Sequence, residues 1–237
     1  MEQQIEQLSG LYSDFLTKSS PEISQKNSSN ILISFAAQLP GQIYTKNFDN
    51  YFSAFEKVFY WSKPDENLTV FGFDDLVTIA ENGINRFKLT EKKLKQAKEF
   101  FISNWDAAGL PFLPLFLGGM KFTPDKDENI WSNFDDSLWF IPKFIFVTTG
   151  DTTYFVFNYY LNSVFSVNIA VEKFKTKLKS IFIPNGKEVN HVSPDIAQMT
   201  DNSPKDKKKW LEKVKQTIDE ITNGSINKVV LSRKVEI

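Results

Sequence analysis

The chain has 237 residues, of which 41% are hydrophobic and 15% aromatic, so it can bury a sizeable core as one large domain or two small ones. Its formal net charge of −1 gives no basis for nucleic-acid binding, and its lack of cysteine excludes disulfides, thiolate nucleophiles and cysteine-bound metals. No stretch approaches the ~20 uncharged apolar residues that a membrane span requires, so we expect no membrane partner. The lack of cysteine fits a reducing cytoplasm, and we expect a cytoplasmic protein without a nucleic-acid partner.

The amino-terminal residues predict a helix followed by a strand. Apolar side chains recur at steps of three and four from Ile5 to Leu16, which is typical of one helix face. Acidic residues and the lack of a basic flank there argue against a signal peptide. Residues 19–29 are rich in Ser and Asn and predict a loop. The apolar segment 31–37 then predicts a buried strand.

Turn residues between two apolar runs predict a hairpin next. Pro64, Asp65 and Asn67 separate Tyr60-Trp61 from the run 68–73. Further on, Thr90 is placed to cap a helix. The apolar face expected for that helix consists of Leu94, Ala97, Phe101 and Trp105.

Two more strand regions and a helix follow. The Gly118-Gly119 pair lies within the apolar segment 111–122 and indicates a strand that bulges or lets another backbone approach closely. The aromatic run 138–160 turns at Thr149 to Thr152, which predicts an antiparallel hairpin. Apolar residues spaced from Val171 to Ile181 predict the next helix.

The last elements are a helix and a strand. Ser203 and Pro204 supply a helix cap and a first turn, and Gly224 ends the helix. The segment 226–237 reads as a strand up to the last residue, so we expect a substantial carboxy-terminal part to be missing. Strand pairs with flanking helices predict an α+β fold whose sheet is mixed or antiparallel.

Lys228 is the candidate catalytic residue of this last strand. Alternation places Lys228 on a face shared with small and apolar neighbours, where a lysine loses solvation and gains strength as a general base. Most strand lysines are solvated, however, so on pattern alone an ordinary solvated lysine is favoured over a catalytic one.

The segment around Lys228 resembles the opening of the domain shared by chorismate-binding enzymes, which include isochorismate, salicylate, anthranilate and aminodeoxychorismate synthases. The resemblance lies in the capped helix with Trp210 and Ile221, then Asn223-Gly224, then the run 226–233, INKVVLSR. Upstream, three further stretches resemble the amino-terminal region of isochorismate synthases in order and spacing: Tyr60 to Pro64, Phe116 to Gly119 and Trp139 to Pro142.

The resemblance implies a role for Lys228. Family members that add water to chorismate carry lysine at this position, whereas those that use ammonia typically carry glutamine. Lys228 would deprotonate the water that attacks carbon 2 of chorismate, giving isochorismate for menaquinone or siderophore synthesis. The family's glutamate general acid and the carboxylates that hold Mg²⁺ lie in the carboxy-terminal half, beyond this sequence. Residues 1–200 would form the amino-terminal region, and residues 201–237 would open the catalytic domain.

Two alternatives stay open. A salicylate synthase also keeps the lysine but goes on to eliminate pyruvate. A non-catalytic chorismate-binding or interaction module would keep this half of the fold without the rest. In every case we expect this chain by itself to be inactive, because it lacks the general acid and the metal ligands.

Overall fold

The structure is a computed structural model in which the chain divides into two compact units, Met1–Val189 and Asn190–Ile237. It describes residues 2–26, 28, 30–39, 55, 57–110, 116–124, 132–182, 204–224 and 226–230. Each unit is described by itself. No helix among these residues is long and apolar enough to cross a membrane.

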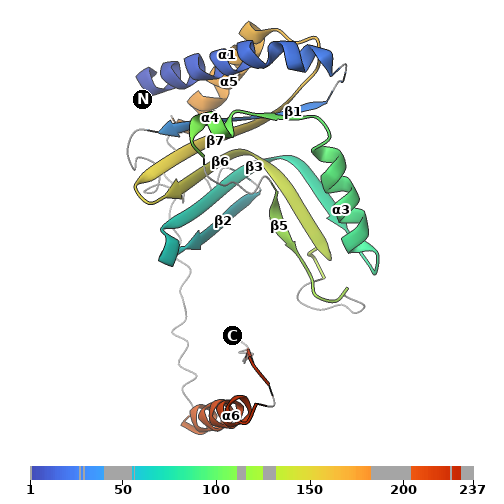
Figure 1. Cartoon of the computed structure of the whole chain (residues 1–237), viewed down its shortest axis with the longest axis vertical. Helices are drawn as coiled ribbons and strands as arrows, with labels where there is room; N and C mark the ends of the chain where they lie inside the picture. The colour runs from blue at the N-terminus through green and yellow to red at the C-terminus, as the bar shows by residue number, and fades with distance from the viewer. Residues whose placement is uncertain are drawn as a thin grey trace. The chain divides into compact units, whose positions relative to one another are not determined.

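The first unit is built on a seven-stranded sheet with the order β2-β3-β6-β7-β1-β4, and β5 pairs with β6 beside this path (Figure 1). The strands are β1 Ile31–Leu39, β2 Val58–Lys63, β3 Leu68–Glu81, β4 Phe101–Ser103, β5 Leu117–Met120, β6 Ser137–Thr149 and β7 Thr152–Leu161. β1 pairs with β4 in parallel, and the other pairs are antiparallel. The predicted α+β class with a mixed sheet is confirmed.

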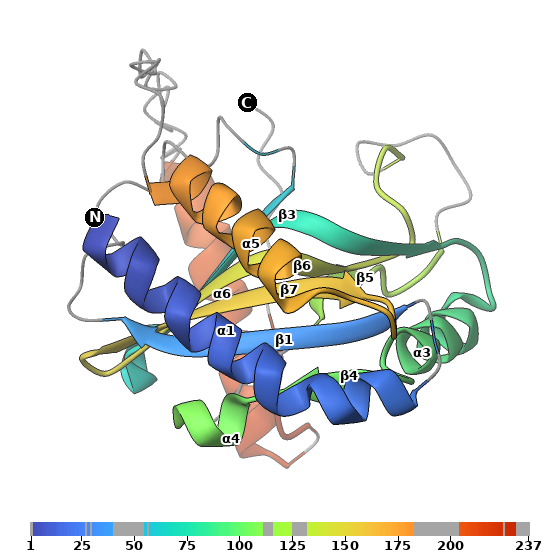
Figure 2. The same cartoon turned by 90° about the horizontal axis from the view of Figure 1, so that it is seen from above.

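Helices α1 (Glu2–Gln25) and α5 (Val167–Phe182) lie side by side over one face of this sheet (Figure 2). Their apolar faces meet the strands in a core dominated by aromatic rings. The Tyr12 ring centroid lies 4.4 Å from that of Phe174, and the Phe174 centroid lies 4.8 Å from that of Phe157. Edge-to-face and offset contacts of this kind add stability beyond the burial of apolar area.

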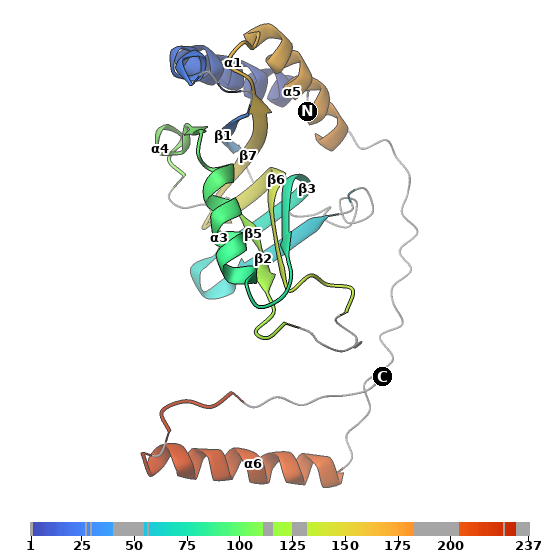
Figure 3. The same cartoon turned by 90° about the vertical axis from the view of Figure 1, so that its right-hand side faces the viewer.

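A second apolar cluster covers the other face. Val70, Ile145 and Val156 pack there with Leu110 and with the short helix α4 (Trp105–Ala108). A further helix, α3 (Arg86–Ala97), packs along β3 and β6, as Figure 3 shows from the side. The sheet is therefore covered on both faces, which explains why its strands read as apolar runs rather than as strict alternation.

The side chain of Asn104 continues the hydrogen bonding along β1 beyond the end of β4. The Asn104 side chain accepts a hydrogen bond from the Ala36 N–H at 2.7 Å and donates one to the Ala36 carbonyl at 2.9 Å. An amide side chain has the donor and acceptor of a peptide group, so Asn104 replaces the next residue of the ladder. Trp105 then donates its indole N–H to Ser34 Oγ at 2.9 Å, which satisfies the buried hydroxyl.

The two predicted hairpins and the predicted strand at 31–37 are confirmed. β2 and β3 form the first hairpin, with Asn67 in the left-handed region at φ 48° between them. β6 and β7 form the second, and they turn at Gly150. Gly118 in β5 has φ 153°, and a Cβ built on it would lie 2.1 Å from the Leu138 carbonyl oxygen. The expected close backbone approach is therefore present at Gly118.

The predicted loop over residues 19–29 is wrong in its first part. Helix α1 continues through Pro21 to Gln25, although proline removes one helical hydrogen bond. Ile23 is completely buried and extends the apolar face about two turns beyond Leu16. Burial of this face outweighs the poor helix propensities of the Ser-Ser-Pro sequence.

The predicted cap at Thr90 is also wrong. Helix α3 begins at Arg86, so Thr90 lies inside it, completely buried, with its hydroxyl 2.7 Å from Ser137 Oγ. Helix α3 ends at Ala97, and Phe101 and Trp105 belong to β4 and α4 instead. Pairing of β4 with β1 draws Phe101 into the sheet and ends the helical periodicity.

Candidate functional site

The second unit contains helix α6 (Pro204–Thr222), which leads to Lys228. Gly224 ends this helix as predicted. It has φ 74°, and its N–H donates to the Ile221 carbonyl at 3.0 Å, while the Asn223 N–H donates to the Asp219 carbonyl at 2.9 Å. A left-handed glycine after the last turn satisfies carbonyls that the helix leaves open. The predicted cap at Ser203 lies outside the described residues.

The apolar stripe of α6 is exposed within the described part of its unit. Trp210 and Val214 are half-buried, whereas Leu211, Ile218 and Ile221 are 57%, 55% and 38% exposed. Helix α6 therefore has the predicted amphipathic pattern, but the described residues do not form a core under it.

Lys228 lies just after this helix and is exposed. Residues 226–230 form no strand, which differs from the prediction, and 231–237 lie outside the described residues. A strand exists only where its backbone N–H and C=O groups pair with a neighbour, and the described part of this unit contains no other strand. Val230 is 81% exposed for the same reason.

The position of Lys228 limits what the described residues can do chemically. A lysine acts as a general base when its surroundings disfavour the charged ammonium group. The described neighbours of Lys228 leave it in water, so they do not provide the desolvated wall that alternation along a strand predicts.

A magnesium site does not fit the described residues. Nowhere in the described ranges do three or more His, Asp or Glu side chains gather as ligands would. The adjacent carboxylates of Asp74 and Asp75 are paired instead with Lys143 at 2.9 Å and with Lys57 at 3.0 Å. Partial burial of Asp75 works against its ionisation, but hydrogen bonds from Thr78 and Lys57 outweigh this and lower its pKa.

Arg86 forms a buried polar centre that no sequence pattern indicated. The residue is 2% exposed, and its guanidinium donates to the carbonyls of Gly83 at 3.2 Å, Lys121 at 3.0 Å and Phe122 at 2.8 Å. These carbonyls belong to the segments just before α3 and just after β5. Arg86 therefore ties the two segments together, a structural role rather than a catalytic one. Because arginines are mostly exposed, no pattern in the sequence indicated that Arg86 is buried.

Comparison with known families identifies the class of protein. Residues 15–237 match the model of the family described as "Chorismate binding enzyme". The match takes in both the sheet of the first unit and the segment that carries Lys228. The chain therefore belongs to the chorismate-binding enzyme family.

Individual relatives are more distant. The isochorismate synthase MenF of Bacillus subtilis (strain 168) is 22% identical over 183 residues, which cover 75% of this chain and 38% of the relative. Among solved structures, MenF, the menaquinone-specific isochorismate synthase from Escherichia coli, matches with a TM-score of 0.39 and 12% identity over 69% of this chain and 33% of that one. The chain thus spans well under half the length of these relatives.

Proposed function

We propose that this chain is the amino-terminal portion of an isochorismate synthase, in which Lys228 activates the attacking water. The observation that carries the proposal is the family match, which runs from residue 15 through the segment that contains Lys228. The name of the Bacillus subtilis relative supports the choice of isochorismate synthase within the family. The lysine at position 228 agrees with the branch that adds water rather than ammonia.

The reaction is balanced in atoms and protons. Lys228 takes a proton from water, and the oxygen of that water bonds to carbon 2 of chorismate. The ring double bonds shift, and the hydroxyl at carbon 4 leaves as water after it is protonated by a general acid. Chorismate and isochorismate are isomers, since one water enters and one leaves. The isochorismate would supply menaquinone or siderophore synthesis.

Lys228 needs surroundings that the described residues of its own unit do not supply. A base of this kind requires removal from water, and Lys228 is exposed among the described residues. We therefore propose that the other walls of the site, the general acid and the carboxylates for Mg²⁺ belong to a region that corresponds to the part of the relatives not matched by this chain. The 237-residue chain alone is then expected to form no isochorismate.

The test is an isochorismate assay on the longest gene product that contains this sequence. Chorismate and Mg²⁺ are supplied, and products are separated by liquid chromatography. Lys228→Ala is expected to lower kcat by at least about 100-fold, in line with the loss of a general base. Lys215→Ala, an exposed lysine of α6, is the matched control and is expected to keep the wild-type rate.

Each outcome of the assay favours one of the three functions. Isochorismate that disappears in Lys228→Ala supports the proposal. Release of pyruvate with salicylate would replace it with a salicylate synthase. Chorismate binding without any product, or a Lys228→Ala variant with the wild-type rate, would contradict the catalytic role and favour a binding module. Chelation of Mg²⁺ by EDTA is expected to stop turnover of the active protein.

A further inference from the structure

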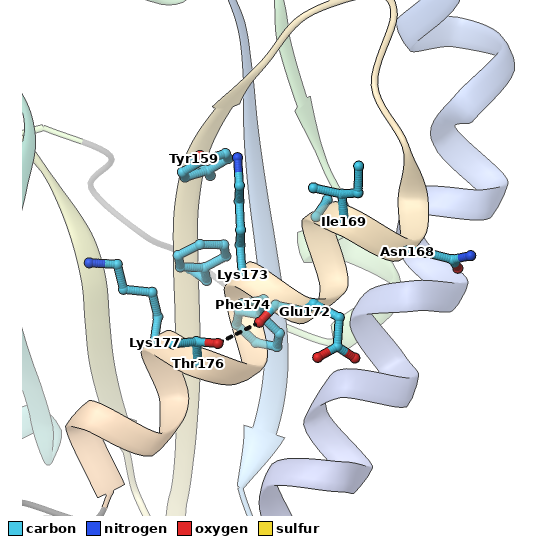
Figure 4. Close-up of a pocket in the computed structure, with 10 residues that line it drawn as sticks. Tyr159, Asn168, Ile169, Glu172, Lys173, Phe174, Thr176 and Lys177 are labelled. Atoms are coloured by element: carbon cyan, nitrogen blue, oxygen red, sulfur yellow. Dashed lines mark hydrogen bonds between the residues drawn. The ribbon is translucent and has the colours of Figure 1, made fainter.

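An open pocket of about 510 Å³ lies between helix α5 and strand β7 in the first unit (Figure 4). Its floor is aromatic. The rings of Phe157 and Tyr159 stack with centroids 5.7 Å apart and planes 16° apart, and Phe174 closes the base 4.8 Å from Phe157. This volume lies within the range of about 300–1,000 Å³ that is usual for small-molecule sites.

One face of α5 forms the side of this pocket. Ile169, Lys173 and Lys177 follow each other at steps of four and all line it. The adjoining face of the helix, with Phe174 and Leu178, is buried in the core. Ile169 is 60% exposed, so the pocket leaves a large apolar side chain in water beside two ammonium groups.

The charges along α5 are divided between its sides. Lys175 pairs with Glu6 of α1, so its charge is neutralised within the fold. The ammonium groups of Lys173 and Lys177 form no ion pair or hydrogen bond with any described residue. Glu172 also lines the pocket, but Figure 4 shows its carboxylate pointing toward α1, away from both ammonium groups. The pocket therefore presents a net positive charge over an apolar floor.

We propose that this pocket binds a small organic anion that carries an apolar ring. The ring would lie on Phe157 and Tyr159 and cover Ile169, which removes apolar surface from water. The acid group would meet the ammonium groups of Lys173 and Lys177. The Tyr159 hydroxyl has no hydrogen-bond partner among the described residues and provides a further donor.

The test uses two fluorescent probes on the full 237-residue chain. 8-Anilino-1-naphthalenesulfonate carries the ring and the negative charge, and N-phenyl-1-naphthylamine is its neutral counterpart. The double variant Lys173→Gln/Lys177→Gln is expected to weaken binding of the sulfonate about 3-fold to 10-fold, from the usual strength of partly exposed charge pairs. Its Kd for the neutral probe is expected to change by less than about 2-fold.

Two further variants control this result. Lys88→Gln/Lys92→Gln removes two exposed lysines, also four residues apart, from α3, and is expected to leave both probes unaffected. Thr176→Trp places a large ring at the pocket wall and is expected to weaken both probes. Far-UV circular dichroism verifies that each variant is folded. The proposal is overturned if the α5 double variant binds the sulfonate as tightly as wild type, if the α3 variant weakens it equally, or if Thr176→Trp leaves both probes unaffected.

Discussion

Helices α5 and α6 have the same kind of amphipathic sequence but different surroundings. The apolar face of α5, with Phe174 and Leu178 completely buried, packs against the sheet and α1. The apolar residues Leu211 and Ile218 of α6 are more than half exposed. Periodicity therefore predicts which face of a helix is apolar, but only a partner surface determines whether that face contributes to stability.

The largest expected effect on stability comes from the buried face of α5. Phe174→Ala removes a ring that contacts Tyr12, Phe35 and Phe157, and is expected to lower the free energy of unfolding of the first unit by about 3–5 kcal/mol. Leu211→Ala in α6 is expected to change it by less than about 0.5 kcal/mol. Urea unfolding followed by near-UV circular dichroism measures both. Equal losses in the two variants would show that α6 is as well packed as α5.

A second contrast distinguishes two neighbouring glycines of β5. Gly118→Ala would bring a Cβ into the Leu138 carbonyl, whereas a Cβ at Gly119 would have no atom within 4 Å. Strain at φ 153° adds to the clash, so Gly118→Ala is expected to cost about 2–3 kcal/mol and Gly119→Ala under about 1 kcal/mol. Thermal unfolding of the two variants side by side is the measurement. A tolerant Gly118 would mean that β5 can move away from β6.

A third contrast compares a buried with an exposed polar side chain of α3, Arg86 and Lys88. Arg86→Met removes the guanidinium that donates to the carbonyls of Gly83, Lys121 and Phe122, and is expected to cost about 2–3 kcal/mol. Lys88→Met, on the exposed side of the same helix, serves as the control, with a change below about 0.5 kcal/mol. Hydrogen exchange at residues 121–122 should accelerate in Arg86→Met alone. Unchanged exchange would exclude the tie between α3 and the end of β5.

The smallest expected effect concerns the titration of Asp75. Its pKa in the folded protein lies below the ordinary value of 3.8, so its stabilising contribution is full above that value and is lost as the pH falls through the lowered pKa. Thr78→Val removes one of the hydrogen bonds to the carboxylate and is expected to raise the pKa of Asp75 toward 3.8. Carboxyl ¹³C NMR titration measures the shift, with the Glu91 titration as an internal control. A pKa of Asp75 that does not move would assign the lowering to Lys57 and to the backbone hydrogen bond at Asp75.

The sequence predicted most of the first unit because its signals were local. Asn67 and Gly150 have positive φ and mark the two hairpins, and the spacing of Phe174 and Leu178 gives the buried face of α5. Predictions failed where distant contacts decided the outcome. Burial of Ile23 carried α1 through Pro21, and pairing with β1 drew Phe101 out of the predicted helix.

For the candidate site, the sequence predicted which residue could act but not the surroundings of that residue. Lys228 could be chosen from alternation and from the family resemblance, but its surroundings depend on strand partners that the described residues do not include. Lys173 and Lys177 were missed because exposed lysines on a helix are common. A signal was nevertheless present, since Ile169 shares their face at the same spacing of four.

The side chain of Asn104 has a consequence for how the molecule behaves at high concentration. An uncovered strand edge is a template on which another chain can add a strand, and this is the first step of aggregation. By occupying both backbone groups of Ala36, Asn104 shortens the part of β1 that is open to such addition. The amide side chain of Asn104 thus reduces the tendency of this sheet edge to self-associate. It does so without a further strand to cover the edge and without a charged side chain.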